Sequence, residues 1–150
     1  FDGDEKIDLR RSRTDTIGSV ARYLSLHGWQ PGGTIALPAV VTGNPAPLLT
    51  GGILPSMLPR ELESRGVRIA GQISEATGHA RAALIELVDP GASTEYWVGF
   101  NNFYVITRYN RSSFYAMSVF QLSEALRVAK TSSAAVVKPA RRKTPRTARR

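Results

Sequence analysis

The stretch FNNFYVITRYNRSSFY, residues 100–115, places aromatic rings among asparagines and arginines at close spacing. An aromatic ring stacks on the apolar face of a pyranose, and amide groups form hydrogen bonds with hydroxyl and acetamide groups. The same composition also suits a core aromatic cluster whose asparagines occupy turns. Composition alone therefore leaves two interpretations open, a sugar-binding surface and a structural cluster. The aromatic side chains concerned are Phe103, Tyr104, Tyr109, Phe114 and Tyr115.

A helix is predicted near the start of the chain, from Asp15 to His27. Its apolar residues, from Ile17 to Leu24, recur at helical spacing. Ser12 stands three residues before Asp15 and suits the N-cap, although Thr14 is an alternative. Gly28 is expected to end the helix.

The middle of the chain is rich in glycine and proline, which disfavour long helices. Strands are predicted at 34–41, 80–88 and 94–98, with a turn at 89–91 between the last two. Pro38 lacks an N–H group, so an edge position or a bulge is expected there. A short helix at 60–65 and an amphipathic closing helix at 113–129 complete an α+β module with a small mixed or antiparallel sheet.

The net charge of +8 is concentrated at the C-terminus. Of the 20 basic residues, seven lie in 131–150, a segment without acidic residues; the other 13 nearly balance the 12 acidic residues. We expect 131–150 to be a disordered basic tail. The absence of cysteine excludes disulfides and thiolate chemistry. No apolar run is long enough to span a membrane, and no signal peptide is visible.

Three elements occur in an order that resembles a known family. They are IGSVARYLSLHGWQPG (residues 17–32), a strand expected over YWVGFNNFYVITRYNRS (residues 96–112), and FYAMSVFQLSEAL (residues 114–126). Their order and motifs are similar to those of lytic murein transglycosylase B and its relatives. The resemblance covers residues 1–130 and implies the C-terminal part of a lysozyme-like catalytic domain. A β-rich insertion is expected at 34–99, of which residues 34–94 match the family least well.

The resemblance implies cleavage of the β-1,4 bond between N-acetylmuramic acid and N-acetylglucosamine in peptidoglycan. In this family one glutamic acid protonates the glycosidic oxygen. Its carboxylate then takes a proton from the C6 hydroxyl, and a 1,6-anhydromuramic acid forms. The glutamate lies in a helical segment that precedes the part matched here. No catalytic residue is therefore expected in this chain, which we expect to be an inactive fragment of a longer enzyme.

Five residues match family positions at the glycan cleft. Tyr109 and Asn110 match a tyrosine–asparagine pair beside the catalytic acid, and Tyr115 matches the tyrosine that opens the closing helix. Tyr23 matches a tyrosine on the helix before the His–Gly–Trp turn. Arg108 is expected to support this wall or to form a structural ion pair.

The resemblance also implies an EF-hand-like calcium loop at residues 1–15. The expected ligands are the carboxylates of Asp2, Asp4 and Asp15 and the carbonyl of Lys6. Two features depart from the family. The first ligand position would precede Phe1, and Glu5 stands where a turn glycine with a left-handed conformation is usual.

The expected partner is therefore a peptidoglycan glycan strand, bound by a monomer in the periplasm or cell envelope of a Gram-negative bacterium. Outer-membrane anchoring through a preceding N-terminus is compatible with this expectation. Two alternatives remain: a non-catalytic peptidoglycan-binding module, and a polyanion-binding protein that uses its basic tail. Specific nucleic-acid binding is not expected, because no aromatic residue is interleaved with the basic residues of the tail. Contact of the tail with anionic envelope polymers is expected instead.

Overall fold

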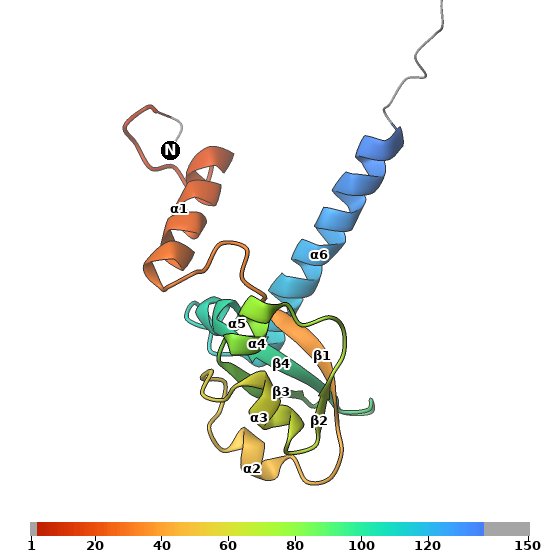
Figure 1. Ribbon diagram of the computed structural model, residues 1–150. Helices are drawn as coiled ribbons and strands as arrows, with labels where there is room; N and C mark the ends of the chain where they lie inside the picture. Colours follow the sequence, from red (N-terminus) through yellow and green to blue (C-terminus); the bar gives the residue numbers. More distant parts are fainter. Residues whose placement is uncertain (1–2, 137–150) are drawn as a thin grey trace, which may run out of the picture. The chain divides into compact units, whose positions relative to one another are not determined.

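The computed structural model describes the backbone of residues 3–136 and the side chains of residues 3–132 (Figure 1). The expected tail at 137–150 lies outside the described residues. The chain divides into two compact units, Phe1–Phe120 and Gln121–Arg150. Among the described residues, no helix is both long enough and apolar enough to cross a membrane.

The first helix, α1 (Arg13–Leu26), confirms the predicted entry helix. The side-chain oxygen of Ser12 accepts a hydrogen bond from the N–H of Asp15 at 3.2 Å, so Ser12 and not Thr14 is the N-cap. The helix ends at His27, and Gly28 follows with a φ of +88°. Glycine adopts this left-handed conformation without a Cβ penalty, which explains the helix end at this position.

Four strands form one antiparallel sheet in the order β2-β1-β4-β3. The α+β class is confirmed, and the sheet is antiparallel instead of mixed. The three longer strands were predicted from the sequence, whereas the three-residue β2 was not. Their bounds are β1 (Ala36–Val41), β2 (Val67–Ile69), β3 (Ala82–Leu87) and β4 (Glu95–Phe100).

The edge position expected for Pro38 is wrong, because β1 lies between β2 and β4. The carbonyl of Pro38 accepts a hydrogen bond from the N–H of Ala70 at 2.8 Å. Since Pro38 has no N–H to return, the ladder with β2 ends there and covers only residues 39–41 of β1. An inner strand tolerates this proline because the missing N–H group falls at the position where the ladder with β2 ends.

Three short helices interrupt the β-rich region: α2 (Ala46–Leu49), α3 (Pro59–Glu63) and α4 (Glu75–His79). Only α3 was predicted, at 60–65, and the helix begins one residue and ends two residues before these bounds. A carboxylate oxygen of Glu61 accepts the N–H of Leu58 at 2.6 Å at its start. Gly66 follows the helix with a φ of +89°, and a Cβ there would approach the carbonyl oxygen of Thr42 to 2.5 Å.

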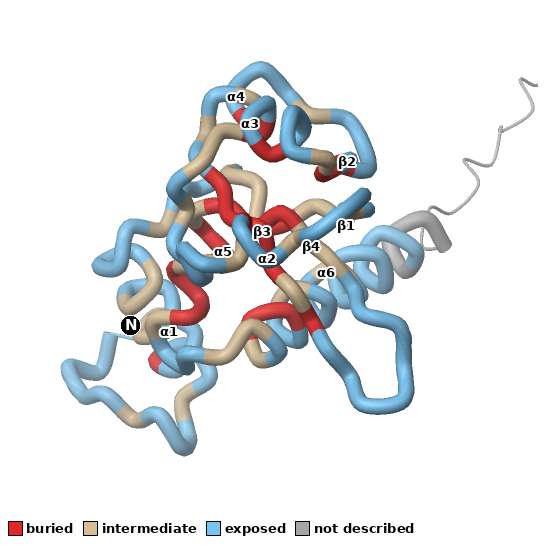
Figure 2. The backbone as a smooth tube through the Cα atoms, turned by 90° about the horizontal axis from the view of Figure 1, so that it is seen from below, coloured by how far each residue is buried: buried red, intermediate tan, exposed pale blue. Residues whose placement is uncertain are grey.

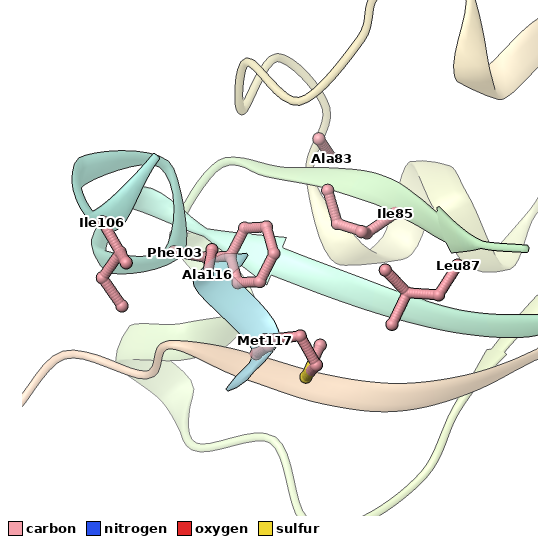
Figure 3. Packing of buried hydrophobic residues seen from close by; sticks show 8 residues of the cluster. Ala83, Ile85, Leu87, Phe103, Ile106, Ala116 and Met117 are labelled. Carbon is pink, nitrogen blue, oxygen red and sulfur yellow. The ribbon is translucent and has the colours of Figure 1, made fainter. Parts of the chain in front are cut away.

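The two faces of the sheet bury two hydrophobic clusters. On one face, α5 (Asn101–Ile106) and the start of α6 (Ser113–Val136) pack their apolar side chains against β3 (Figure 3). On the other face, Leu48 of α2 and Leu62 of α3 pack against Leu84 and Val98. Buried residues accordingly concentrate in β3, β4, α5 and the first turns of α6 (Figure 2).

The strand expected to run from Tyr96 to Ser112 is wrong beyond Phe100. β4 ends at Phe100, and α5 begins at the next residue. The side chains of Phe103 and Ile106, three positions apart, therefore lie on one helical face and enter the same cluster. The aromatic stretch thus contains a helix, a connection over residues 107–112 and the start of a second helix.

The closing helix α6 extends to Val136, beyond the predicted end at residue 129. Thr131 and Ser132, expected in a disordered tail, are helical, and both hydroxyls donate to the carbonyl of Val128. In the second unit, Arg127 forms an ion pair with Glu124 at 2.5 Å. The hydrogen bond from Arg127 lowers the pKa of the Glu124 carboxyl.

Candidate functional site

Three tyrosines from separate elements meet at one surface. Tyr23 comes from α1, Tyr109 from the turn after α5, and Tyr115 from the first turn of α6. The ring of Tyr109 lies between the other two, with its centroid 6.0 Å from each. The Tyr23 and Tyr109 rings are perpendicular, while the Tyr109 and Tyr115 rings are tilted by 32°. These are favourable geometries for aromatic pairs.

The three rings line a pocket of about 450 Å³. Its remaining walls are mainly apolar, and no lining residue has a carboxylate, an imidazole or an amine. The pocket can therefore contact the apolar faces of a ligand, but it offers no proton-transfer group suited to neutral pH. The other lining residues are Leu9, Ser19, Val20, Leu24, Ile106 and Val119.

A tight connection between α5 and α6 fixes Tyr109 and Tyr115. The N–H of Ser112 donates to the carbonyl of Asn110 at 2.7 Å, which closes the turn that presents Tyr109. The hydroxyl oxygen of Ser112 accepts the N–H of Tyr115 at 3.2 Å and so caps the start of α6. Tyr109 is 72% exposed in consequence, whereas Tyr115 packs partly against the core.

Asn101 and Asn102 act within the structure and not towards a ligand. The buried amide of Asn102 accepts the N–H of Gln30 at 2.8 Å and donates to the carbonyls of Gln30 and Gly33 at 2.7 and 3.0 Å. Asn101 donates to the carbonyl of Gly28 at 2.7 Å. Both therefore hold the loop that follows α1 against the start of α5. For these two residues the structural interpretation of the aromatic stretch is correct.

The other two predicted cleft residues do not line the pocket. Asn110 is exposed on the turn beside Tyr109. The guanidinium carbon of Arg108 lies 4.2 Å from the centroid of the Tyr104 ring, a cation–π contact. The Nε atom of Arg108 is buried and has no hydrogen-bond partner among the described residues. The described contacts of Arg108 are thus with Tyr104 of α5 and not with the pocket.

Sequence reasoning missed the apolar walls of the pocket. Val20 and Leu24 were recognised only as the apolar face that predicts α1. Val20 is 55% exposed, so this part of the face borders a pocket and is not covered by the described core. Ile106 lines the pocket from α5, a helix that the sequence pattern did not predict, whereas Val119 was recognised only as part of the apolar face of the closing helix.

The residues expected to bind calcium are only partly described. Asp2 lies outside the described residues. A carboxylate oxygen of Asp4 accepts the N–H of Lys6, and one of Asp15 accepts the N–H of Asp8, each at 2.9 Å. Glu5 has a φ of +63°, which confirms the expected left-handed conformation.

Within residues 3–132, no three His, Cys, Asp or Glu side chains gather as a metal site would require. The carboxylates of Asp4 and Asp15 instead organise backbone turns, so the described residues alone do not fit a calcium ion.

Several glutamate side chains form hydrogen bonds away from the tyrosine pocket. Glu61 caps α3. A carboxylate oxygen of Glu86 accepts the Tyr96 hydroxyl at 3.0 Å, and one of Glu95 accepts the Trp97 indole N–H at 3.2 Å. None of the chain's glutamates lines the tyrosine pocket.

Comparison with known proteins places these features in a family. Residues 1–124 match the family model described as a transglycosylase SLT domain. The membrane-bound lytic murein transglycosylase B of Escherichia coli is 38% identical over 130 residues, which cover 87% of this chain and 34% of that protein. The chain thus spans about a third of the length of the curated relative it matches.

Solved structures show the same fold. The calcium complex of the E. coli lytic transglycosylase Slt35 is 38% identical, with a TM-score of 0.71 over 87% of this chain and 39% of that chain. SltB3 from Pseudomonas aeruginosa, in complex with NAG-anhNAM-pentapeptide, is 29% identical, with a TM-score of 0.65 over 79% of this chain and 32% of that chain. The chain belongs to the transglycosylase SLT family and has the lysozyme-like fold of its lytic transglycosylases.

Proposed function

We propose that this chain is the glycan-binding part of a lytic murein transglycosylase. The complete enzyme would cleave the bond between N-acetylmuramic acid and N-acetylglucosamine and form 1,6-anhydromuramic acid. The convergence of Tyr23, Tyr109 and Tyr115 on one mainly apolar pocket is the observation that supports this proposal most strongly. The related SltB3 was solved with NAG-anhNAM-pentapeptide, whose anhydro sugar matches the proposed product.

The proposed roles follow the position of each side chain. Tyr109, flanked by Tyr23 and Tyr115, would stack on sugar rings, because its ring is the most accessible of the three. The exposed amide of Asn110 would form hydrogen bonds with a sugar substituent. Arg108 would act indirectly, because its contact with Tyr104 would support the backbone that presents Tyr109.

The proton-transfer group would lie outside this chain. A glutamic acid must first donate a proton to the glycosidic oxygen and then accept one from the C6 hydroxyl. No carboxylate lines the pocket, and the chain spans only about a third of its curated relative. We therefore expect the chain alone to bind peptidoglycan without cleaving it. It would do so as a monomer in the periplasm, where the basic tail would contact anionic envelope polymers.

A sedimentation assay with purified peptidoglycan sacculi tests this proposal. The chain should co-sediment with sacculi and release no anhydromuropeptides, and Tyr109→Ala should lower binding by about tenfold. Phe114→Ala is the matched control, since Phe114 is an exposed aromatic residue (51%) that does not line the pocket. Equal binding by the wild type and Tyr109→Ala would contradict the proposed site.

The second candidate is a non-catalytic peptidoglycan-binding module, favoured by the absence of a carboxylate among the pocket residues. The complete protein separates the two candidates. If Asn110→Ala strongly lowers the release of anhydromuropeptides but barely changes the melting temperature, the result would support the enzyme proposal. No release by the wild-type complete protein would support the module.

A further inference from the structure

The pairing between strands β1 and β4 ends before the end of β1. Their pairing runs from Ala36–Gly99 to Ala39–Tyr96, and β1 continues to Val41 beside β2. Between the separated ends lies a second pocket of about 470 Å³, lined by 38–41 and 94–97. We call this place the β1–β4 gap. None of its lining residues belongs to the tyrosine pocket.

Backbone groups face the gap without a partner. On the β2 side, the carbonyl of Pro38 accepts the N–H of Ala70, and the N–H of Thr42 donates to the carbonyl of Gly66. Since hydrogen-bonding groups alternate along a strand, the N–H and carbonyl of Val41 face the β4 side. The opposing residue would be Thr94, but no hydrogen bond between these two residues is found in the described part of the chain. One rung of the ladder is therefore open at the protein surface, where its N–H and carbonyl groups can bond to water or to a ligand.

The side chains around the gap combine apolar surface with a carboxylate. Trp97 pairs with Pro38 across the strands, so both lie on the same face of the sheet as Val40 and Glu95. The Trp97 ring is half-buried, because it packs against the first hydrophobic cluster and lies edge-on to Phe120 at 6.3 Å. Val40 is 61% exposed. The indole N–H of Trp97 donates to Glu95 at 3.2 Å, which holds the carboxylate beside the ring. A ring with a fixed acceptor at its edge matches a sugar, which has an apolar face and peripheral hydroxyls.

We propose that the β1–β4 gap binds an N-acetylhexosamine residue of a glycan strand, away from the tyrosine pocket. The pyranose would lie against Trp97, Pro38 and Val40, and its hydroxyls would donate to Glu95. Its acetamide has one N–H and one carbonyl, the groups needed at the open rung beside Val41. This inference rests on the proposed function, because it assigns a second contact with the same polymer.

A peptide is a poorer match for the same place. An added strand needs a row of free backbone groups along a sheet edge. The ladders with β2 and β4 occupy both sides of β1 at Ala39, so only the single rung at Val41 remains. One acetamide fits this geometry, whereas an extended peptide would find no second rung.

An NMR titration of the full chain with tri-N-acetylchitotriose tests the proposal. The indole N–H signal of Trp97 and the amide signals of Val41 and Thr94 should shift in a saturable manner. Val40→Arg should weaken the affinity measured from these signals by about tenfold, because the long side chain would occupy the gap. Val88→Arg is the matched control, since Val88 is 54% exposed and lies outside the gap. It should bind like the wild type.

Failure at the gap is distinguishable from failure at the tyrosine pocket. Tyr109→Ala should leave the shifts at Trp97, Val41 and Thr94 in place. Shifts confined to residues of the tyrosine pocket would overturn the gap proposal and leave the proposed function standing. A soluble stem peptide that shifts the gap signals when the sugar does not would also overturn it, as would equal weakening by Val40→Arg and Val88→Arg.

Discussion

Asn102 connects two parts of the chain that are 72 residues apart in sequence. Its amide is 1% exposed and bonds to backbone groups of Gln30 and Gly33. A Cβ on Gly33 would stand 3.0 Å from the amide nitrogen, so the loop packs closely around this side chain. Since α1 bears Tyr23 and α5 leads to Tyr109, these bonds help to set the width of the tyrosine pocket.

Asn102→Ala should therefore lower both stability and glycan binding. The change removes three part-buried hydrogen bonds to Gln30 and Gly33, at a cost of about 2 kcal/mol in free energy of unfolding. Urea denaturation measures this loss. Asn101→Ala is the control, because it removes a single bond to Gly28 and should cost about 1 kcal/mol or less. A smaller loss for Asn102→Ala than for Asn101→Ala would contradict the assigned role.

Tyr96 gives the sheet a predictable pH dependence. Partial burial, and then the hydrogen bond and charge of Glu86, raise the pKa of the Tyr96 phenol above its usual value of 10.0. The folded state then holds a proton that the unfolded state loses as pH rises. This contribution to stability is complete below about pH 10 and is lost as pH rises through the folded pKa.

Tyr96→Phe should remove this contribution, because phenylalanine has no proton to lose. Urea denaturation of both proteins at about pH 8 and about pH 11 measures the effect. The wild type should lose more stability than Tyr96→Phe over that interval. The same loss in both proteins would show that Tyr96 does not titrate in the way the Glu86 contact requires.

At the scale of the elements, the stability of α1 depends on the contacts of its first turn. The backbone N–H of Ser12 donates to the carbonyl of Asp8, and its side chain caps the helix. Asp15, the one residue of α1 that is buried, bonds to the Asp8 N–H at 2.9 Å. The apolar Ile17, by contrast, is 70% exposed. Capping and the Asp15 contact therefore hold this helix start more than burial of an apolar face does.

Ser12→Ala should lower the free energy of unfolding by about 1 kcal/mol, the usual cost of a lost N-cap. Thermal denaturation followed by circular dichroism measures the change. Ser12→Asp retains an acceptor and should restore most of the loss, whereas Thr14→Ala should have little effect. A larger loss of stability for Thr14→Ala than for Ser12→Ala would show that Thr14 is the N-cap.

The helix α5 shows why part of the site could not be predicted. Long elements such as α1 gave clear periodic patterns and cap signals. The sequence NNFYVI of α5 is short and rich in residues that favour strands, and it directly follows a real strand. Contacts distant in sequence, with the 30–33 loop and with the core around Phe103, stabilise a helix there. Tyr109 and Tyr115 were nevertheless singled out, because their motif matches the family independently of α5.

At the scale of the whole molecule, the described residues form two candidate binding surfaces, and no carboxylate lines the tyrosine pocket. The tyrosine pocket and the β1–β4 gap both combine aromatic rings with exposed apolar residues, and they lie on different elements. Several described carboxylates, in contrast, bond within the structure: Glu61 caps a helix, Asp15 supports a turn, and Glu86 bonds to Tyr96 across a strand pair. The proposed function assigns polymer binding to the first unit and proton transfer to a part outside this chain, so binding and cleavage must be measured separately.

Calcium provides a further test at this scale, because the N-terminal loop resembles an ion site in sequence. A ligand that binds only the folded state raises its stability, by about 2.7 kcal/mol at a hundred times the dissociation constant. The carboxylates of Asp4 and Asp15 bond to backbone N–H groups, and no three potential metal ligands gather within residues 3–132. Millimolar calcium should therefore leave the melting temperature of this chain unchanged, as measured by scanning calorimetry with and without EGTA. A rise that EGTA reverses and Asp15→Asn abolishes would show that the loop binds calcium.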